Sequence, residues 1–274
     1  MSHPTPILRW AGGKRYLLPD LLSHLPVNAN KRRYHEPFLG AGTLFFALRP
    51  KTAVLSDANE HLVRCYQSVR DDPDSVAFYL RDHAKRTGHK HYYAVRAVYN
   101  RSRFSGAQAA RFIYLNKTCF NGIFRVNLDG EFNVPYGHKE PPFLPTRQQL
   151  RDAGRALSKT VLRTLPFEKS LGDVHSKDFV YLDPPYPPLN GTANFTHYTA
   201  DRFRAEDQQR LAEEVRRIDD KGALFMMSNA DTPIVRRLYS GFAMKRLTVT
   251  RYVTCKAVKH AVRELLITNY DLPV

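Results

Sequence analysis

Short apolar runs alternate along the chain with glycine turns and amphipathic stretches, and their spacing predicts the order of strands and helices. In residues 1–60 the segments RRYHEPF, GAG, TLFFALR and TAVLSDAN follow one another. They predict a strand, a tight turn, a helix and a second strand, which is the order of a parallel βαβ unit.

The same alternation resumes after Arg147. The segments TVLRTLPF, DFVYLDPPY and GALFMMSN predict strands, and AEDQQRLAEEVRRIDD predicts a helix with Leu211, Val215 and Ile218 on one face. TPIVRRLY predicts a short helix that begins at Thr232, and FAMKRLTVTRYV with RELLITNY predicts a late pair of strands. The second half therefore continues one α/β sheet.

Residues 61–145 have a different character. Helical stretches rich in Tyr and Arg, such as SVAFYLRDHAKR, lead to a loop rich in Gly, Asn and Pro, CFNGIFRVNLDGEFNVPYGHKEPP, which is too irregular for a core helix. We therefore expect an α/β domain formed by residues 1–60 and 146–274, interrupted by a basic insertion at 61–145. Such inserts often determine substrate recognition because the sheet stays rigid while the insert varies.

Charge adds a candidate partner. The net charge is +16, and residues 81–151 contain 13 Lys or Arg against 4 Asp or Glu, together with several Tyr and Phe. This mixture suits phosphate contact and base stacking, although a basic solvated surface without a nucleic-acid role fits the composition equally well.

Hydropathy, the amino-terminal segment and the cysteines disfavour several classes of protein. No apolar run approaches the length of a membrane span, and the amino terminus lacks the layout of a secretory signal. Cys65, Cys119 and Cys255 are odd in number and far apart, so neither a disulfide framework nor a metal site is indicated. We expect a protein of the reducing bacterial cytoplasm or nucleoid, or one encoded by a phage.

The segment EPFLGAG predicts a nucleoside site. Gly40 and Gly42 follow a strand and open a helix, whose first amide groups are free to bind a ligand. Asp57 ends the next strand, where a carboxylate can accept both ribose hydroxyls of a nucleoside cofactor. A glycine turn with a purely structural role is the alternative. The pattern lacks the full GxGxxG fingerprint, which disfavours a nicotinamide dinucleotide.

Two further segments contain side chains that could bind a ligand near this turn. RWAGGK holds the chain's one tryptophan, Trp10, and Lys14, which is suited to pair with a carboxylate; a glycine turn with a buried tryptophan is the alternative. FVYLDPPY predicts a buried parallel strand with Asp183 at its carboxyl end, where open α/β sheets bind ligands. Pro184 and Pro185 stiffen the backbone, so Asp183 and a nearby carbonyl can accept the two hydrogens of an amine. Tyr186 can stack on the ring that carries this amine.

Taken together, RWAGGK, EPFLGAG, SDAN, NKTCFNGIFRVNLDGEFNVPYG, DPPY and NFTHY, in this order, resemble the Dam-type (D12 class) family of DNA adenine-N6 methyltransferases. The resemblance covers nearly the whole chain, and its DPPY and NGIFR…GEFNVPYG blocks are far more specific than a glycine loop. It implies a mostly parallel methyltransferase sheet flanked by helices, an inserted helical DNA-recognition domain, and S-adenosylmethionine as cofactor.

By the same resemblance, site residues transfer onto matching positions. The residues implied to bind the cofactor are Trp10, Lys14, Phe38, Gly40, Gly42, Asp57 and Asp183. The residues implied to hold the target adenine are Asp183, Pro184, Pro185 and Tyr186. Adenine's exocyclic nitrogen is a poor nucleophile because its lone pair is delocalised, and two hydrogen bonds from its amine favour a pyramidal nitrogen. The base must be flipped from the duplex to be reached, and Phe195 or Tyr198 of NFTHY could receive it.

DNA recognition is implied for the insert and for basic positions near it. Phe120 and Asn121 would enter the opened site, Ile123 would contact bases, and Arg125 would read a guanine, with a phosphate contact as the alternative. GATC in double-stranded DNA is the expected target. The remaining positions implied to contact DNA are Arg9, Tyr136, Lys256 and Lys259.

Two departures from the family pattern are visible. Arg9 stands where related sequences often have Lys, and the strand before DFVYL lacks the usual acid at its end, leaving Glu168 and Asp173 as candidates. An RNA adenine methyltransferase, an enzyme acting on another planar amine and an inactive DNA-binding protein are the alternatives. We expect a monomer without an obligatory protein partner; whether the enzyme is paired with a restriction activity stays open.

Overall fold

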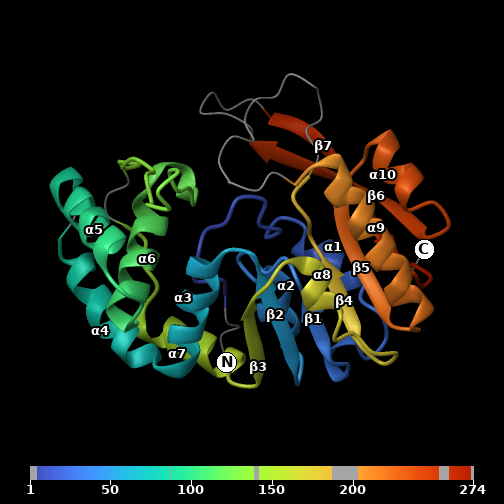
Figure 1. Cartoon of the computed structure of the whole chain (residues 1–274), viewed down its shortest axis with the longest axis horizontal. Coiled ribbons are helices and arrows are strands. Elements are labelled where there is room, and N and C mark those ends of the chain that lie inside the picture. The colour runs from blue at the N-terminus through green and yellow to red at the C-terminus, as the bar shows by residue number, and fades with distance from the viewer. Residues whose placement is uncertain (1–4, 87, 139–141, 187–202, 253–258, 273–274) are drawn as a thin grey trace.

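The computed structural model describes residues 5–86, 88–138, 142–186, 203–252 and 259–272. Its centre is a seven-stranded sheet with the spatial order β3-β2-β1-β4-β5-β7-β6 (Figure 1). The strands run over Tyr34–Glu36 (β1), Ala53–Asp57 (β2), Thr160–Thr164 (β3), Phe179–Leu182 (β4), Leu224–Ala230 (β5), Ala243–Tyr252 (β6) and Lys259–Thr268 (β7).

The sheet is parallel from β3 to β5 and antiparallel at its other edge. β1 pairs in parallel with both β2 and β4, and β4 pairs in parallel with β5. β7 inserts between β5 and β6 and is antiparallel to both. The predicted fold class, an α/β protein with a mostly parallel sheet, is therefore confirmed. Because parallel strands end at one edge, the residues that follow β1, β2 and β4 come together there.

Both faces of the sheet are covered. Phe179 and Tyr181 of β4 belong to one apolar cluster and Val180 and Leu182 to the other, so the strand is buried on both sides. This burial explains why FVYL reads as a continuous apolar run. The alternation of side chains along an extended strand sends neighbours to opposite faces, and it thereby fixes which core each residue joins.

The helices form two groups (Figure 1). Beside β3 lies the group that contains most of the chain between β2 and β3, and beside β5 lies the group formed by the later helices. The first group comprises α3 (Glu60–Asp71), α4 (Pro73–Ala84), α5 (His89–Arg101), α6 (Gly106–Thr118) and α7 (Arg147–Leu157). The remaining helical elements are α1 (Leu18–Ser23), η1 (Ala29–Lys31), α2 (Thr43–Leu48), η2 (Phe120–Gly122), α8 (Phe167–Leu171), α9 (Ala205–Asp220) and α10 (Pro233–Leu238).

Local signals account for the helix boundaries. The predicted apolar face of α9 is buried at Leu211, Val215 and Ile218. The side chain of Thr232 accepts a hydrogen bond from Val235 N at 3.3 Å and caps α10 as predicted. Asp72 caps α4 in the same way, with Pro73 in the first helical position.

The segment from 119 to 138 contains little regular structure, as predicted. Two isolated bridges cross it, Cys119 with Tyr136 and Val126 with Phe132. The apolar cluster below it runs without interruption from the sheet into α4, α5 and α6. A boundary at residues 61 and 145 therefore stays a prediction. Among the described residues, none of the helices combines the length and apolar character needed to cross a bilayer.

Candidate functional site

Asp183 lies directly after β4, at the edge of the sheet where the parallel strands end. Lys14 from the amino-terminal loop pairs with it, with 2.6 Å between Nζ and Oδ1. The Lys14 side chain is only 3% exposed and also donates to Gly12 O at 2.8 Å. Two segments far apart in sequence, RWAGGK and DPPY, are thus joined by one buried ion pair.

A hydroxyl chain supports the same carboxylate. Ser228 of β5 donates to Asp183 Oδ1 at 3.0 Å, and its Oγ lies 3.1 Å from the hydroxyl oxygen of Tyr181. Lys14 and Ser228 both contact Oδ1 of this carboxylate. Burial raises the pKa of Asp183 above its usual value, while Lys14 and Ser228 act in the opposite direction. The site therefore holds an acceptor that is easier to protonate than an exposed aspartate.

Tyr186 is placed beside this pair. Lys14 Nζ lies 4.6 Å from the centre of the Tyr186 ring, within the range of a cation–π contact. The Tyr186 hydroxyl donates to Glu264 Oε2 of β7 at 2.6 Å, and Tyr16 donates to Glu264 Oε1 at 2.8 Å. The aromatic ring of DPPY is therefore held at its hydroxyl by a buried carboxylate.

The two prolines differ in their surroundings. Pro184 is buried, whereas Pro185 is exposed and its carbonyl accepts from Gln208 Nε2 at 3.3 Å. Gln208 is itself buried, and Asn229 Nδ2 donates to its side-chain oxygen at 3.4 Å. The backbone after Asp183 is therefore fixed from α9 and β5 as well as by its own rings.

The turn after β1 has its own geometric demands. Gly40 and Gly42 both have positive φ, +46° and +64°. A Cβ on Gly40 would lie 2.8 Å from Trp10 Cδ1, and one on Gly42 would lie 3.2 Å from the Phe46 ring. The fold therefore needs glycine at both positions before any ligand is considered. Their contact with a cofactor stays a prediction.

Asp57 meets this turn from the next strand. Its Oδ2 accepts from Gly40 N at 3.0 Å and its Oδ1 accepts from Asn59 N at 2.9 Å. Burial raises the pKa of Asp57, and the two backbone donors work against that rise. Each carboxylate oxygen retains a second lone pair, so Asp57 can also accept hydroxyl groups.

Glu36 and the rings of Phe167 and Phe203 were absent from the sequence-based set. Burial raises the pKa of Glu36, at the end of β1, well above its usual value, and Tyr34 donates to it at 2.9 Å. Phe38, which was predicted, packs against Phe167 at 5.5 Å and against Phe203 at 5.8 Å between ring centres. These rings border the edge on the side of α8.

The loop 119–138 is tied to the RWAGGK loop. Asn116 on α6 accepts from Arg9 N at 2.8 Å and donates to Arg9 O at 2.7 Å, so one side chain pairs with both backbone groups of that residue. Phe120 is 46% exposed, and Asn121 has a left-handed backbone with φ +54°. Trp10 stacks on Phe124 at 6.1 Å.

The other predicted DNA contacts have different surroundings. Ile123 and Arg125 are half-buried, and Arg125 Nε donates to Asn133 Oδ1 at 2.6 Å. Tyr136 is 5% exposed and packs against Tyr92, so in this conformation it supports the loop instead of offering its ring to DNA. A direct DNA contact of Tyr136 stays a prediction that this burial does not favour.

Other predicted positions cannot be placed. Phe195, Tyr198 and Lys256 lie outside the described residues, and Lys259 is described only through its backbone in β7. The acids considered for the end of β3 are engaged elsewhere. Glu168 pairs with Arg210 at 3.3 Å, and Asp173 pairs with Arg163 at 2.5 Å.

A cationic cluster that sequence reasoning missed lies at the end of α6. Burial, with Arg9 and Arg15 nearby, lowers the pKa of Lys117 to about 8. Within the described ranges, no carboxylate forms an ion pair with any of these three residues. An anion approaching between the two loops would therefore meet unneutralised charge.

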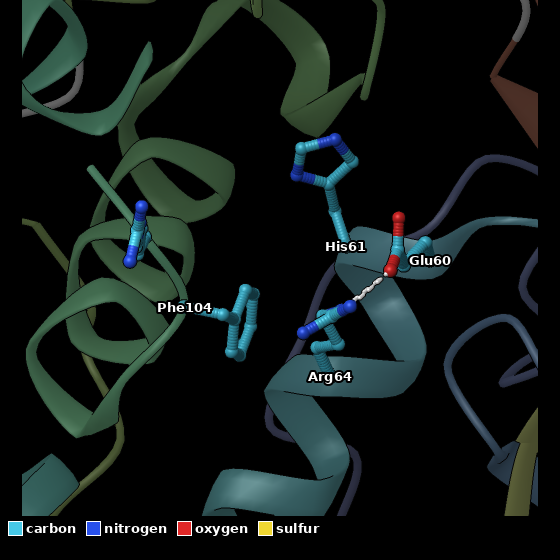
Figure 2. A pocket seen from close by; sticks show the side chains of 5 residues that line it. Glu60, His61, Arg64 and Phe104 are labelled. Atoms are coloured by element: carbon cyan, nitrogen blue, oxygen red, sulfur yellow. Dashed lines mark hydrogen bonds and ion pairs between the residues drawn. The ribbon is translucent and has the colours of Figure 1, made fainter. Parts of the chain in front are cut away.

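A hollow of about 460 Å³ lies beside α3, and Asp183 is not among the residues that line it (Figure 2). Arg64 in its wall pairs with Glu60 at 2.5 Å and faces the Phe104 ring at 5.7 Å. His61 is held by Tyr99, with 2.6 Å between Nδ1 and the hydroxyl oxygen. Because none of the motif carboxylates lines it, the hollow does not compete with the edge of the sheet as the reaction site.

Comparison with known proteins agrees with this geometry. A family model described as D12 class N6 adenine-specific DNA methyltransferase matches residues 10–253. Type II methyltransferase M.MjaIII of Methanocaldococcus jannaschii is 38% identical over 287 residues, which cover 97% of this chain and 99% of that protein. Type II methyltransferase M1.LlaDCHI of Lactococcus lactis subsp. cremoris is 35% identical, covering 97% and 95%.

A DNA adenine methylase of Escherichia coli is 33% identical over 262 residues, which cover 94% of this chain and 93% of that protein. The matches extend across both the sheet and the helices between β2 and β3. The carboxylate after β4, its buried lysine and the family match together identify the chain as an enzyme that uses S-adenosylmethionine, a member of the D12 class of N6 adenine-specific DNA methyltransferases.

Proposed function

We propose that this enzyme methylates adenine within GATC in duplex DNA, with the target base flipped into the site at the end of β4. The observation on which the proposal depends is the placement of Asp183 between Lys14, Ser228 and Tyr186. One carboxylate oxygen is held by the protein, and the other is left to accept a hydrogen bond. An amine on a planar ring fits this arrangement.

The residues at the edge suit S-adenosylmethionine by their donor and acceptor chemistry. Asp57 can accept the ribose hydroxyls, and Lys14 and Asp183 provide charges for the amino-acid end. Trp10, Phe38, Gly40 and Gly42 would line the same pocket. When bound, the cofactor supplies an electrophilic methyl group.

The protein's own contribution is to orient the amine. Asp183 Oδ2 accepts one hydrogen of the adenine amine, and the Pro184 carbonyl accepts the other. Gln208 already donates to the next carbonyl, that of Pro185, so the backbone there is fixed before the base arrives. Two acceptors on one nitrogen favour a pyramidal geometry, in which the lone pair points away from the ring. Fixing the reactants in this way supplies much of the acceleration.

The proton must leave as the new nitrogen–carbon bond forms. Asp183 is an acceptor rather than a strong base, since Lys14 stabilises its ionised form. After transfer the methylated nitrogen is a strong acid, so its proton passes along the orienting hydrogen bond to Asp183 Oδ2 and from there to solvent. Tyr186 would stack on the extruded ring, and an aromatic residue of NFTHY would complete the pocket.

The specificity proposal is based on the loop 119–138. Phe120 and Asn121 lie exposed at η2, where they could enter the opened duplex. Arg125 is pre-positioned by Asn133, which suits a guanidinium that reads one guanine edge. We further propose that residues 61–145 act as the recognition domain and that the enzyme works as a monomer. The choice of GATC follows from the resemblance of the NGIFR…GEFNVPYG block to Dam-type enzymes.

A methyl-transfer assay tests both levels of the proposal. Tritiated S-adenosylmethionine is supplied with a GATC duplex, a scrambled duplex of equal composition and a single-stranded RNA. Label in the GATC duplex alone is expected, and digestion should recover it as N6-methyladenine. Label in both duplexes would overturn the sequence assignment, and label in RNA would move the enzyme to another substrate class. Asp183→Ala should abolish transfer.

A further inference from the structure

A single buried acid on β7 contacts both loops of the proposed active site. Glu264 pairs in register with Ala230 of β5 and with Leu247 of β6, in the antiparallel part of the sheet. Its side chain is 0% exposed, and the next three residues, LLI, are apolar and buried. A carboxylate in such a strand is unusual, because burying it without partners costs several kcal/mol.

Two tyrosine hydroxyls donate hydrogen bonds to Glu264. Tyr186, the last residue of DPPY, donates to Oε2 at 2.6 Å. Tyr16, two residues after the end of the RWAGGK loop at Lys14, donates to Oε1 at 2.8 Å. Each carboxylate oxygen therefore receives one phenol hydroxyl, and such bonds to a charged acceptor are stronger than those between neutral groups.

We propose that Glu264 is a positioning residue for methyl transfer, which fixes the Tyr186 ring in the orientation that the flipped adenine needs. The proposal rests on the function proposed above, in which Tyr186 stacks on that base. A tyrosine side chain has two main torsions, and a hydrogen bond at its hydroxyl restricts both. Tyr16 braces the carboxylate from the other side.

The placement of Lys14 makes this orientation matter for the reacting carboxylate. Lys14 lies over the Tyr186 ring at 4.6 Å and pairs with Asp183 at 2.6 Å. Rotation of the ring would therefore disturb the group that stabilises ionised Asp183. Glu264 acts through Tyr186 and Lys14 and makes no contact of its own with the reacting atoms.

A double-mutant cycle tests the coupling. Glu264→Gln keeps the size of the side chain but replaces one acceptor oxygen with a donor, and Tyr186→Phe removes the hydroxyl but keeps the ring. Each single variant should lower kcat on a GATC duplex about 10- to 100-fold, with KM for S-adenosylmethionine changed less than about threefold. The double variant should be no slower than the worse single variant. Multiplicative losses would overturn the proposal, as would a Glu264→Gln enzyme with wild-type kcat.

Tyr16→Phe is the matched control, because it removes the same kind of bond from the same carboxylate outside DPPY. It should reduce kcat less than Tyr186→Phe does. Should Glu264→Gln fail to fold, the comparison of these two tyrosine variants decides the matter. Equal losses of kcat in the two tyrosine variants would show that Glu264 has only a structural role and would refute the proposal.

A spectroscopic measurement reports on the base itself. A duplex with 2-aminopurine at the target position is bound in the presence of S-adenosylhomocysteine, and its fluorescence is compared between wild type and variant. Glu264→Gln should change the intensity because the stacking ring is no longer fixed, and unchanged intensity would count against the proposal. A wild-type enzyme that fails to methylate adenine would refute the proposed function instead, so the two failures are distinguishable.

Discussion

Replacing Lys14 with Met removes one half of a buried ion pair and leaves the other half in place. The pair is short, at 2.6 Å, and the side chains of Lys14 and Asp183 are 3% and 17% exposed. Loss of one partner from a buried pair costs about 3–5 kcal/mol because the remaining charge is left uncompensated. In domains of this size each kcal/mol lowers Tm by roughly 2–4 °C. We therefore expect a large fall in Tm at neutral pH.

The stability lost in Lys14→Met should depend on pH. Burial already raises the pKa of Asp183, and Lys14 is the largest influence that lowers it. Without Lys14 that pKa rises further, so the folded variant favours the neutral acid. An acid whose pKa is raised by folding loses stability as pH rises through the folded value. The stability deficit of Lys14→Met should therefore be largest at high pH and shrink as the solution is acidified.

Methyl-transfer activity should depend on pH in the opposite sense to stability. In the proposed mechanism the carboxylate form of Asp183 accepts the target amine, so transfer should fall as pH drops through the pKa of Asp183. In Lys14→Met this acid limb should shift to higher pH, and kcat should also fall by at least about 100-fold from lost orientation. Initial rates with tritiated cofactor from pH 5 to 9, beside thermal melts in the same buffers, measure both effects.

The exposed Lys51 provides the control, because Lys51→Met removes the same charge without breaking a buried pair. It should leave Tm and the pH–rate profile near wild type. A Lys14→Met enzyme whose acid limb coincides with that of wild type would show that Lys14 does not set the ionisation of Asp183.

Three further variants probe the supporting structure. Gly40→Ala should lower the free energy of unfolding in urea by more than Gly241→Ala does, because both variants place a Cβ on left-handed backbone at a cost of about 1–2 kcal/mol but only the Cβ at position 40 also meets Trp10; equal losses would contradict this. Asn116→Leu should lower the free energy of unfolding in urea by about 1–3 kcal/mol, because two backbone groups of the RWAGGK loop lose their partner; an unchanged midpoint contradicts this. Burial lowers the pKa of Lys117 to about 8, so DNA affinity should fall as pH rises past that value, because only the charged lysine attracts phosphate. Lys117→Arg should remove this fall in fluorescence anisotropy titrations at constant salt. An equal dependence of affinity on pH in wild type and Lys117→Arg would show that Lys117 is not responsible.

Much of the fold could be predicted because local patterns agree with the tertiary environment. FVYL reads as a buried strand, and β4 is buried on both faces. The helix signals at 205–220 and at Thr232 gave the correct elements because their caps and apolar faces depend on neighbours a few residues away. The loop 119–138 was recognised from its glycine, asparagine and proline content.

The supporting contacts of the site were not predictable in the same way. Glu264 stands in an apolar run, and a lone acid there was the signal that could have drawn attention to it. Its partners Tyr16 and Tyr186 are 248 and 78 residues distant along the chain, so no local pattern joins the three. The position of β7 between β5 and β6 is what brings them together.

The sequence by itself determined the order of the elements and the residue types that bear the chemistry, because both depend on side-chain periodicity and on short rigid motifs. Only the tertiary structure decided which of these groups meet. Lys14 pairs with Asp183, Asn116 holds the loop of Arg9, and Tyr136 is buried against Tyr92. The physical reason is that ion pairs, hydrogen bonds and burial depend on distances in space, and in a parallel sheet with a large helical excursion those distances bear little relation to separation along the chain.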